Sequence, residues 1–257
     1  MYDAGSDQWR CKPSMVFVDK ELVVSKQEEG VNRDPILVRY LDQPVTTARY
    51  IGKRYRKSKF AQIPLMYIRD VLTHETARHY LGLFNKALLD AYADFHEKLI
   101  MVPVVHARIL SAFRYNTVMQ PGDDSDDTIL DFMNIEPFIE GKFTKISNNN
   151  RYINKKVNKD TMDLAMAFSH FTWCESEGRL IVNDLQGWSR DGTTILTDPC
   201  IITYNYCMGN VDCGKEGIQN FWTFQHVQCN DICHKLRLYR PRRHGDGGQG
   251  DIQTTRL

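Results

Sequence analysis

The chain has 257 residues, of which 42% are hydrophobic and 25% are charged, and its formal net charge is +1. This length fits one large domain or two closely associated lobes, and the composition is that of a soluble globular protein. A net charge near zero provides no general field for nucleic acid or for a membrane surface. No apolar run reaches the roughly 20 residues of a membrane span. We therefore expect neither nucleic acid nor membrane as a partner.

The N-terminus and the cysteines indicate the compartment. Residues 1–7 have neither the basic start nor the apolar core of a signal peptide. The seven cysteines are an odd number without a regular spacing, which favours reduced thiols, some of them metal-bound. Both observations predict a cytoplasmic protein.

Residues 48–55 alternate between apolar and polar side chains in the manner of a β-strand. The alternation places Lys53 on the same face as Ile51 and Tyr55. A lysine on an apolar face either extends its ammonium group to the edge of the sheet or reaches a bound anion. Other apolar runs predict strands at 15–18, 22–24 and 102–113.

Residues 65–99 carry the clearest helical pattern, with apolar side chains at spacings of three to five. Asp70 lies in the first turns, where a carboxylate interacts favourably with the helix dipole. Its alternative role is to hold Lys53. The acidic run at 120–127 does not have the spacing of an EF-hand, so we expect a solvated loop there.

A boundary between two lobes is predicted near residues 137–142. A strand that starts at Ile129 reaches Pro137, which removes a backbone donor, and Gly141 follows. We therefore expect a first lobe at 1–140, made of a sheet and the long helix, and a second lobe at 141–240.

The stretch around Asp184 carries the strongest chemical signal. Leu180 to Val182 has strand character, and Asp184, Gln186 and Gly187 follow it. Asp198, fixed by the next proline, supplies a second carboxylate. Two acids and an amide oxygen make a plausible Mg²⁺ site. The alternative is a strand that leaves the core through an ordinary turn.

A zinc site is the second chemical signal. Residues 215–238 have helical periodicity, and a continuous helix would bring His226, Cys229 and Cys233 onto one face. An imidazole and two thiolates suit tetrahedral Zn²⁺, with His170 as the fourth ligand. His234 is a weaker candidate because it points off this face. The alternative is that the cysteines are small core residues.

One glycine-rich segment precedes this predicted helix and another follows it. Gly209 and Gly214 lie in a loop before it, and such a loop either approaches phosphates or a peptide closely or simply forms a turn. The glycine-rich tail at 241–257 is predicted to be disordered.

Taken together, these stretches resemble the catalytic domain of the alpha-kinases, a family of atypical serine/threonine protein kinases. The resemblance spans about residues 45–238. The motifs that carry it are Ala167–Thr172, Asp184–Gly187, Leu196–Pro199, Gly214–Ile218 and Cys229–Cys233.

The resemblance implies an α+β, protein-kinase-like fold of two lobes, with an ATP cleft between them and a zinc-stapled C-terminal lobe. It also implies roles by position. Lys53 would contact the ATP phosphates and Asp70 would pair with it. Glu136 and Phe138 would meet adenine at the hinge.

The remaining roles lie in the second lobe. Gln186 and Asp198 match the magnesium ligands, and Asp184 matches the catalytic carboxylate. The loop of Gly209 and Gly214 matches one that engages nucleotide or peptide. The residues that match the structural zinc site are His170, His226, Cys229 and Cys233.

Three departures from the family pattern stand out. Two residues separate His226 from Cys229 where the family has one, and Val211 replaces the middle glycine of the loop. Ser189–Thr194 is an insertion that we expect to form a surface loop.

The predicted function is transfer of the γ-phosphate of Mg-ATP to Ser or Thr of a protein substrate. The alternative, motivated by the departures at Val211 and His226, is a catalytically silent kinase-like domain that acts as a zinc-stabilised interaction module. The sequence assigns no oligomeric state and no physiological substrate.

Overall fold

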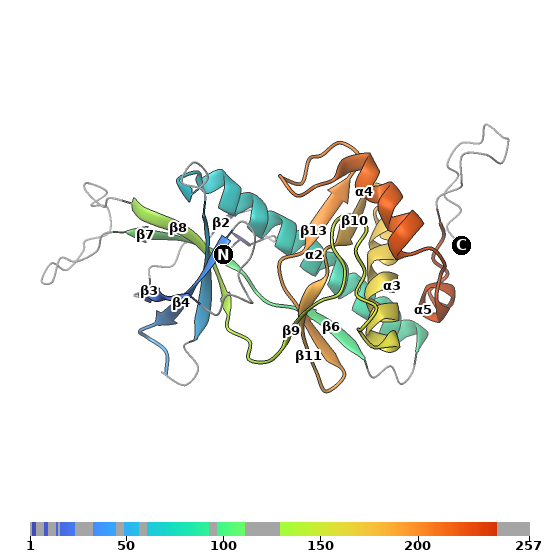
Figure 1. Ribbon diagram of the computed structural model, residues 1–257, viewed down its shortest axis with the longest axis horizontal. Coiled ribbons are helices and arrows are strands. Elements are labelled where there is room, and N and C mark those ends of the chain that lie inside the picture. The colour runs from blue at the N-terminus through green and yellow to red at the C-terminus, as the bar shows by residue number, and fades with distance from the viewer. Residues whose placement is uncertain are drawn as a thin grey trace, which may run out of the picture.

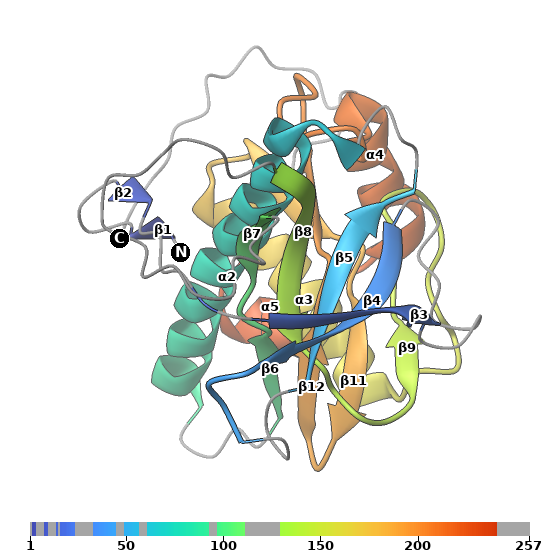
Figure 2. The same ribbon diagram turned by 90° about the vertical axis from the view of Figure 1, so that its left-hand side faces the viewer.

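The computed structural model describes residues 2–3, 8–9, 14, 16–23, 33–44, 49–56, 61–92, 97–110 and 129–240 (Figure 1). Its largest sheet has five antiparallel strands in the order β3-β4-β5-β8-β7 (Figure 2). These strands are β3 (Val16–Val23), β4 (Arg33–Tyr40), β5 (Tyr50–Tyr55), β8 (Ile129–Pro137) and β7 (Val105–Leu110). A separate small hairpin pairs β1 (Tyr2–Asp3) with β2 (Gln8–Trp9).

The second half of the chain builds two further sheets and the remaining helices. A four-stranded sheet has the order β6 (Lys98–Met101), β12 (Thr193–Leu196), β11 (Gln186–Arg190) and β9 (Phe143–Lys145), and β10 (Leu180–Asn183) pairs with β13 (Cys200–Thr203). The helical elements are α3 (Lys159–Glu175), α4 (Gly214–Asn220), η1 (Phe221–Gln225) and α5 (Asp231–Lys235).

The long helix α2 (Pro64–Ala91) connects these parts. Proline in the first turn suits a helix start, because its missing N–H would have no intrahelical partner. One stripe of α2 contacts β7 and β8, and further along it contacts β6, β13 and α3 (Figure 1). The helix therefore lies against the five-stranded sheet and against the second half of the fold.

The predicted helix at 65–99 ends too late. Tyr92 already has an extended backbone, and Lys98–Met101 forms β6, which pairs in parallel with β12. Leu99 and Met101 are buried while Lys98 and Ile100 are exposed, which is the period of two that marks a strand. The apolar residues of β6 continue the helical pattern by chance.

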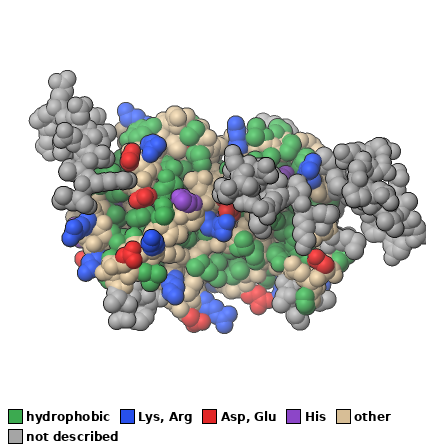
Figure 3. Space-filling view, turned by 180° about the vertical axis from the view of Figure 1, so that it is seen from behind, with side chains coloured by type: hydrophobic (Ala, Val, Ile, Leu, Met, Phe, Trp, Pro, Cys, Tyr) green, Lys and Arg blue, Asp and Glu red, His purple; other side chains and the backbone are tan. Residues whose placement is uncertain are grey.

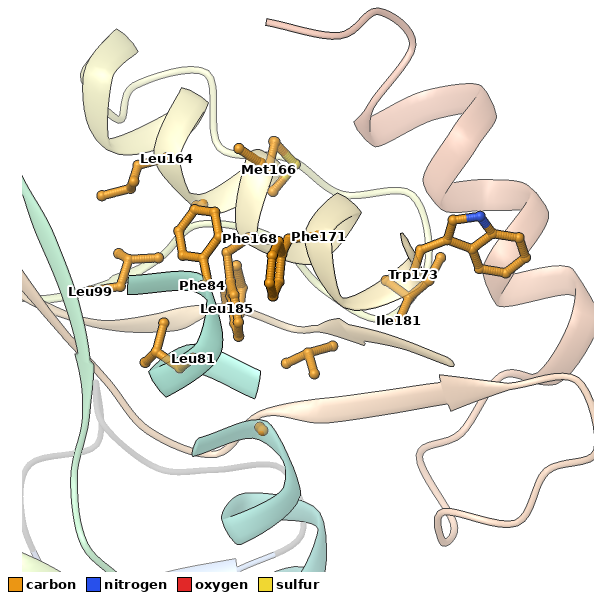
Figure 4. Packing of buried hydrophobic residues seen from close by; sticks show 14 of the residues in the cluster. Leu81, Phe84, Leu99, Leu164, Met166, Phe168, Phe171, Trp173, Ile181 and Leu185 are labelled. Carbon is orange, nitrogen blue, oxygen red and sulfur yellow. The ribbon is translucent and has the colours of Figure 1, made fainter. Parts of the chain in front are cut away.

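The main hydrophobic core lies between α2, α3 and the strands β10 and β13. The ring of Phe84 on α2 packs against Phe168 and Phe171 of α3, with centroids 5.5 and 5.4 Å away (Figure 4). Truncation of such a buried ring typically costs about 3–5 kcal/mol. A smaller cluster, Val38, Met133 and Ile135, lies in the five-stranded sheet.

The predicted surface loop at Ser189–Thr194 is a tight β-hairpin. Ser189 pairs with Thr194 and Arg190 with Thr193, which leaves a two-residue turn. Asp191 and Gly192 both have positive φ, 49° and 73°, as such hairpin turns require. The Asp-Gly dipeptide was the signal for this hairpin.

Charged side chains of both signs are interspersed over the described part of one face (Figure 3). None of the helices in the described ranges combines the length and hydrophobicity that a bilayer crossing requires. The predicted acidic loop at 120–127 and the predicted disordered tail at 241–257 lie outside the described residues.

Candidate functional site

Lys53 extends from β5 and contacts two carboxylates. Its Nζ lies 2.7 Å from Oε1 of Glu136 on the neighbouring strand β8. It also lies 2.7 Å from Oδ2 of Asp198, which follows β12 in the second half of the fold. The side chain of Lys53 is only 13% exposed, so its ammonium group needs such partners, because an unpaired charge there is costly. Lys53 therefore joins the five-stranded sheet to the loop that bears Asp198.

The hydroxyl group of Thr197 lies between the same charges. It donates to Oε2 of Glu136 at 2.7 Å and accepts from Lys53 at 3.1 Å. Its backbone N–H donates to the Gln186 carbonyl at 3.0 Å, which fixes the residue next to β11. Thr197 was not predicted as a site residue, although it stands beside Asp198 within the Leu196–Pro199 motif.

A second cation, Arg33 of β4, reaches the same carboxylate from another side. Its Nη2 lies 3.0 Å from Oδ1 of Asp198, and its Nη1 lies 2.9 Å from Oδ2 of Asp70. Tyr55 donates to the same Asp70 oxygen at 2.8 Å. Among the described residues, the ion-pair partner of Asp70 is Arg33. The predicted ion pair between Asp70 and Lys53 is therefore wrong. Arg33 itself was missed, since its stretch carries no distinctive pattern.

These contacts set the charge state of the two aspartates. Burial alone would raise the pKa of Asp198, but Arg33 and Lys53 outweigh it and hold the pKa below its ordinary value. Burial raises the pKa of Asp70, and Arg33 opposes that rise. Asp198 is therefore firmly ionised.

Asp184 lies at the end of β10 with a positive φ of 57°. Lys145 of β9 approaches its Oδ1 to 2.7 Å and also contacts Oε1 of Gln186 at 3.5 Å. The amide nitrogen of Gln186 donates to the backbone carbonyl of Asp198 at 3.1 Å. Burial raises the pKa of Asp184, whereas Lys145 lowers it. The predicted metal and catalytic residues thus form one connected group with Lys53.

Of the two predicted hinge residues, Glu136 lies on β8 and Phe138 directly follows the last residue of this strand. The backbone N–H of Phe138 donates to the Arg49 carbonyl at 3.0 Å, and the Arg49 guanidinium stacks over the Phe138 ring at 4.4 Å. The side chain of Glu136 is held by Lys53 and Thr197. The backbone N–H of Phe138 and the side chain of Glu136 are thus both engaged within the fold.

The glycine-rich loop is organised around the buried carboxylate of Asp212. It accepts from both the backbone N–H and the hydroxyl of Thr203, at 3.0 and 2.6 Å, and from the Gly214 N–H at 2.9 Å. Gly214 has a φ of 60°, and a Cβ there would lie 2.1 Å from the ring of Tyr206. Only glycine fits this position, so Gly214 has a structural reason apart from any ligand.

The predicted continuous helix at 215–238 is wrong. The helical path through α4 and η1 ends at His226, and α5 starts anew at Asp231. The side chain of Asn230 accepts from the Cys233 N–H at 3.0 Å and caps α5. Asn230 also donates to the Asp163 carbonyl of α3 at 2.7 Å. This cap anchors α5 against α3.

The four predicted zinc ligands nevertheless converge. Their ligand atoms all lie within 4.8 Å of one another, and we call the group His170, His226, Cys229 and Cys233 the zinc cluster. Nδ1 of His170 is 3.1 Å from Nε2 of His226 and 3.8 Å from Sγ of Cys229. Sγ of Cys233 is 3.5 Å from Nε2 of His226. Tetrahedral Zn²⁺ with ordinary bond lengths would separate such atoms by about 3.3–3.8 Å, so these residues fit zinc.

Burial also lowers the pKa of both imidazoles in the zinc cluster. It lowers the pKa of His170 to about 4 and the pKa of His226 to about 3, the latter with a contribution from His170. Both rings are therefore neutral near pH 7, which is the form that binds metal. His234 is not part of the cluster.

The fold and the site together define an alpha-kinase. The chain belongs to the alpha-kinase family, whose sequence profile matches residues 28–233. It is similar to alpha-protein kinase 1 of Homo sapiens, with 32% identity over 243 residues, and to myosin heavy chain kinase B of Dictyostelium discoideum, with 34% identity over 234 residues. These regions cover 93% and 90% of this chain but only 18% and 27% of those proteins. The resemblance inferred from the motifs is confirmed.

Solved structures support the same fold. The chain resembles a novel alpha kinase from Entamoeba histolytica, with a TM-score of 0.68, 22% identity and coverage of 89% of this chain and 80% of that chain. It also resembles the alpha-kinase domain of myosin heavy chain kinase A in complex with AMP, with a TM-score of 0.64, 23% identity and coverage of 88% and 91%. The arrangement of mixed helices and sheets is thus the alpha-kinase fold.

Proposed function

We propose that this chain is the catalytic domain of a protein kinase that transfers the γ-phosphate of ATP to Ser or Thr of a protein substrate. The observation that carries the proposal is the 2.7 Å ion pair between Lys53 and Asp198, which joins two parts of the fold that are far apart in sequence. Family membership supports kinase chemistry, and the nucleotide complex of the similar myosin heavy chain kinase A supports a nucleotide site.

The nucleotide would lie beside Lys53. Lys53 would contact the phosphates, and backbone groups near Glu136 and Phe138 would bind adenine. We propose that the two lobes meet at this segment, as residues 1–140 and 141–240, with β6 of the first segment paired to β12 of the second. The groups around Lys53 carry both signs of charge, so they can hold a polyphosphate and its counter-ion together.

Magnesium is the counter-ion that the donor set favours. Asp198 and Gln186 present a carboxylate and an amide oxygen, both hard ligands, and they are linked by a hydrogen bond. The ion, when bound, neutralises charge that develops on the transferring group. Phosphoryl transfer needs little covalent help from the protein, so fixed positions and fixed charges provide most of the catalysis.

Asp184 is the proposed acceptor of the hydroxyl proton. Its pKa is raised by burial, which makes it a better base than an ordinary carboxylate, while Lys145 keeps it oriented and ionised. The raised pKa suits a group that must be ionised before transfer and must take up a proton during it.

Asp184→Asn is expected to lower phosphoryl transfer by about 100- to 10,000-fold, the usual contribution of a general base. Asparagine tolerates positive φ, so the backbone at 57° is retained. The measurement is incorporation of radiolabel from ATP into the chain itself and into a generic basic protein. Asp191→Asn is the control, since Asp191 also has positive φ, 49°, but lies on an exposed turn.

Two outcomes of this assay would count against the proposal. Wild-type activity in Asp184→Asn would show that Asp184 is not the general base. A wild-type chain that binds ATP but transfers no phosphate would instead be the silent interaction module. Hydrolysis of the labelled product and separation of phosphoserine from phosphothreonine identify the acceptor residue.

We also propose that zinc occupies the zinc cluster and stabilises the surrounding fold. The cluster joins α3 to the chain on both sides of the turn before α5. Bound zinc would therefore connect α3 to the C-terminal part of the fold and add folding energy rather than chemistry.

Removal of zinc by a strong chelator is expected to lower the melting temperature by about 10 °C or more. In a domain of this size each kcal/mol lost shifts the melting temperature by about 2–4 °C. The check is thermal unfolding by circular dichroism, with metal content measured before and after chelation and with zinc added back. An unchanged melting temperature after proven metal loss would contradict the structural role.

A further inference from the structure

The last described residues fold back over the zinc cluster. Arg237 has a positive φ of 54°, which reverses the chain just after α5. The N–H of Leu238 then donates to the Cys233 carbonyl at 2.9 Å. We call residues 236–240 the strap, and they lie beyond the family match at 28–233. Figure 1 shows this end of the chain beside α3 and α5.

The strap meets the ring of His170 from outside the zinc cluster. Nε2 of His170 lies 2.8 Å from the carbonyl oxygen of Tyr239. A carbonyl only accepts hydrogen bonds, so Nε2 carries the proton and Nδ1 presents its lone pair to the cluster. Cys174 donates to the same oxygen at 3.3 Å, one turn further along α3. The Tyr239 carbonyl therefore sets both the tautomer and the orientation of a ligand.

Arg240 attaches the strap to the opposite side of the zinc cluster. Its Nη2 donates to the carbonyls of Trp222 and His226 at 3.2 and 3.0 Å, and its Nη1 donates to the carbonyl of Val227. The guanidinium also stacks over the Trp222 ring at 5.1 Å. Carbonyls at the end of a helical segment lack intrahelical partners. The side chain of Arg240 thus caps the C-terminal end of η1 at His226, which is one of the proposed zinc ligands.

We propose that the strap closes the zinc cluster and that Arg240 is the positioning residue that holds the Tyr239 carbonyl against His170. The inference rests on the zinc site proposed above but not on phosphoryl transfer. Arg240 acts through backbone carbonyls and does not touch the metal. Partners of this outer kind change metal affinity by about 10- to 100-fold.

The test compares Arg240→Ala with Arg240→Lys in the full chain. Arg240→Ala is expected to weaken zinc binding by at least about 10-fold, measured by competition with a coloured zinc chelator. Arg240→Lys keeps the charge but cannot donate to three carbonyls from one planar group, so it is expected to recover only part of the loss. Arg190→Ala, at the exposed end of β11 beside the hairpin turn, removes the same charge and is expected to bind zinc as the parent does.

Two further measurements separate positioning from general stabilisation. The absorption bands of the cobalt-substituted protein should change in intensity in Arg240→Ala, because they report the geometry around the metal. The melting temperature should fall more in the zinc-loaded protein than in the zinc-free protein.

Equal zinc affinity in Arg240→Ala and the parent would overturn the strap inference. Equal loss of melting temperature with and without zinc would also overturn it, since Arg240 would then be only structural. A parent chain that binds no zinc at all would overturn the zinc site and the strap together, which distinguishes the two failures.

Discussion

Asp198→Ala is expected to reduce phosphoryl transfer by at least about 1,000-fold. The carboxylate of Asp198 is held by Lys53 at 2.7 Å and by Arg33 at 3.0 Å, and it is the proposed magnesium ligand. Its removal leaves two cations without their shared partner and takes away fixed charge that stabilises the transferring group. Loss of one such preorganised contact commonly costs about 100- to 1,000-fold in rate, and Asp198 makes several.

The control for Asp198→Ala is Asp191→Ala. Both aspartates have nearly the same backbone, with φ of 48° and 49°, so alanine introduces similar strain at each position. Asp191 is 89% exposed at its side chain and belongs to the hairpin turn. The rate of label transfer from ATP is measured for both variants alongside their circular dichroism. Activity of Asp198→Ala close to that of the control would refute the assignment of Asp198.

Lys53→Arg is expected to lower turnover of ATP by at least about 100-fold while the fold is retained. The ammonium group of Lys53 lies within 2.7–3.1 Å of oxygens from Glu136, Thr197 and Asp198. A planar guanidinium spreads the same charge over a larger group and cannot occupy this position with the same contacts. The phosphates of ATP would consequently lose the compact positive charge that Lys53 is proposed to place beside them.

Steady-state kinetics with varied ATP provides the measurement for Lys53→Arg. The control is Lys159→Arg, where the lysine is 80% exposed and pairs with Asp163 on α3. That variant should keep the parent values of kcat and KM. Parent-like turnover in Lys53→Arg would place the nucleotide away from β5.

The sequence was informative wherever a short pattern determines the local structure. The alternation at 48–55 predicted β5 and put Lys53 on the face of Ile51 and Tyr55, and the ordered motifs singled out Asp184, Gln186 and Asp198, which lie together in the structure. Asp184 directly follows β10, Gln186 begins β11, and Asp198 lies two residues after β12. Because these strands are neighbours in the chain, short connections keep the three residues together. The zinc cluster was also found, since its ligands have distinctive chemistry.

The remaining contacts depend on tertiary packing, which no local pattern encodes. Arg33 of β4 reaches Asp198 across 165 positions in sequence, and the two meet only because the five-stranded sheet packs beside the segment that follows β12. Asp70 was placed correctly on α2, but its partner is Arg33 and not the lysine. The helix at 215–238 failed for a different reason, because one helical path ends at His226 and the cap formed by Asn230 starts another at Asp231.

The two hydrophobic clusters of the described chain are unequal, and this has a consequence for local opening of the backbone. The smaller cluster lies in the sheet that bears Lys53, whereas α3, β10 and β13 belong to the large core. Amide hydrogens exchange with solvent first where burial is sparse. The strand that carries Lys53 should therefore exchange faster than the strands next to Asp184, and a ligand that bridges the two should slow exchange mainly on the lysine side.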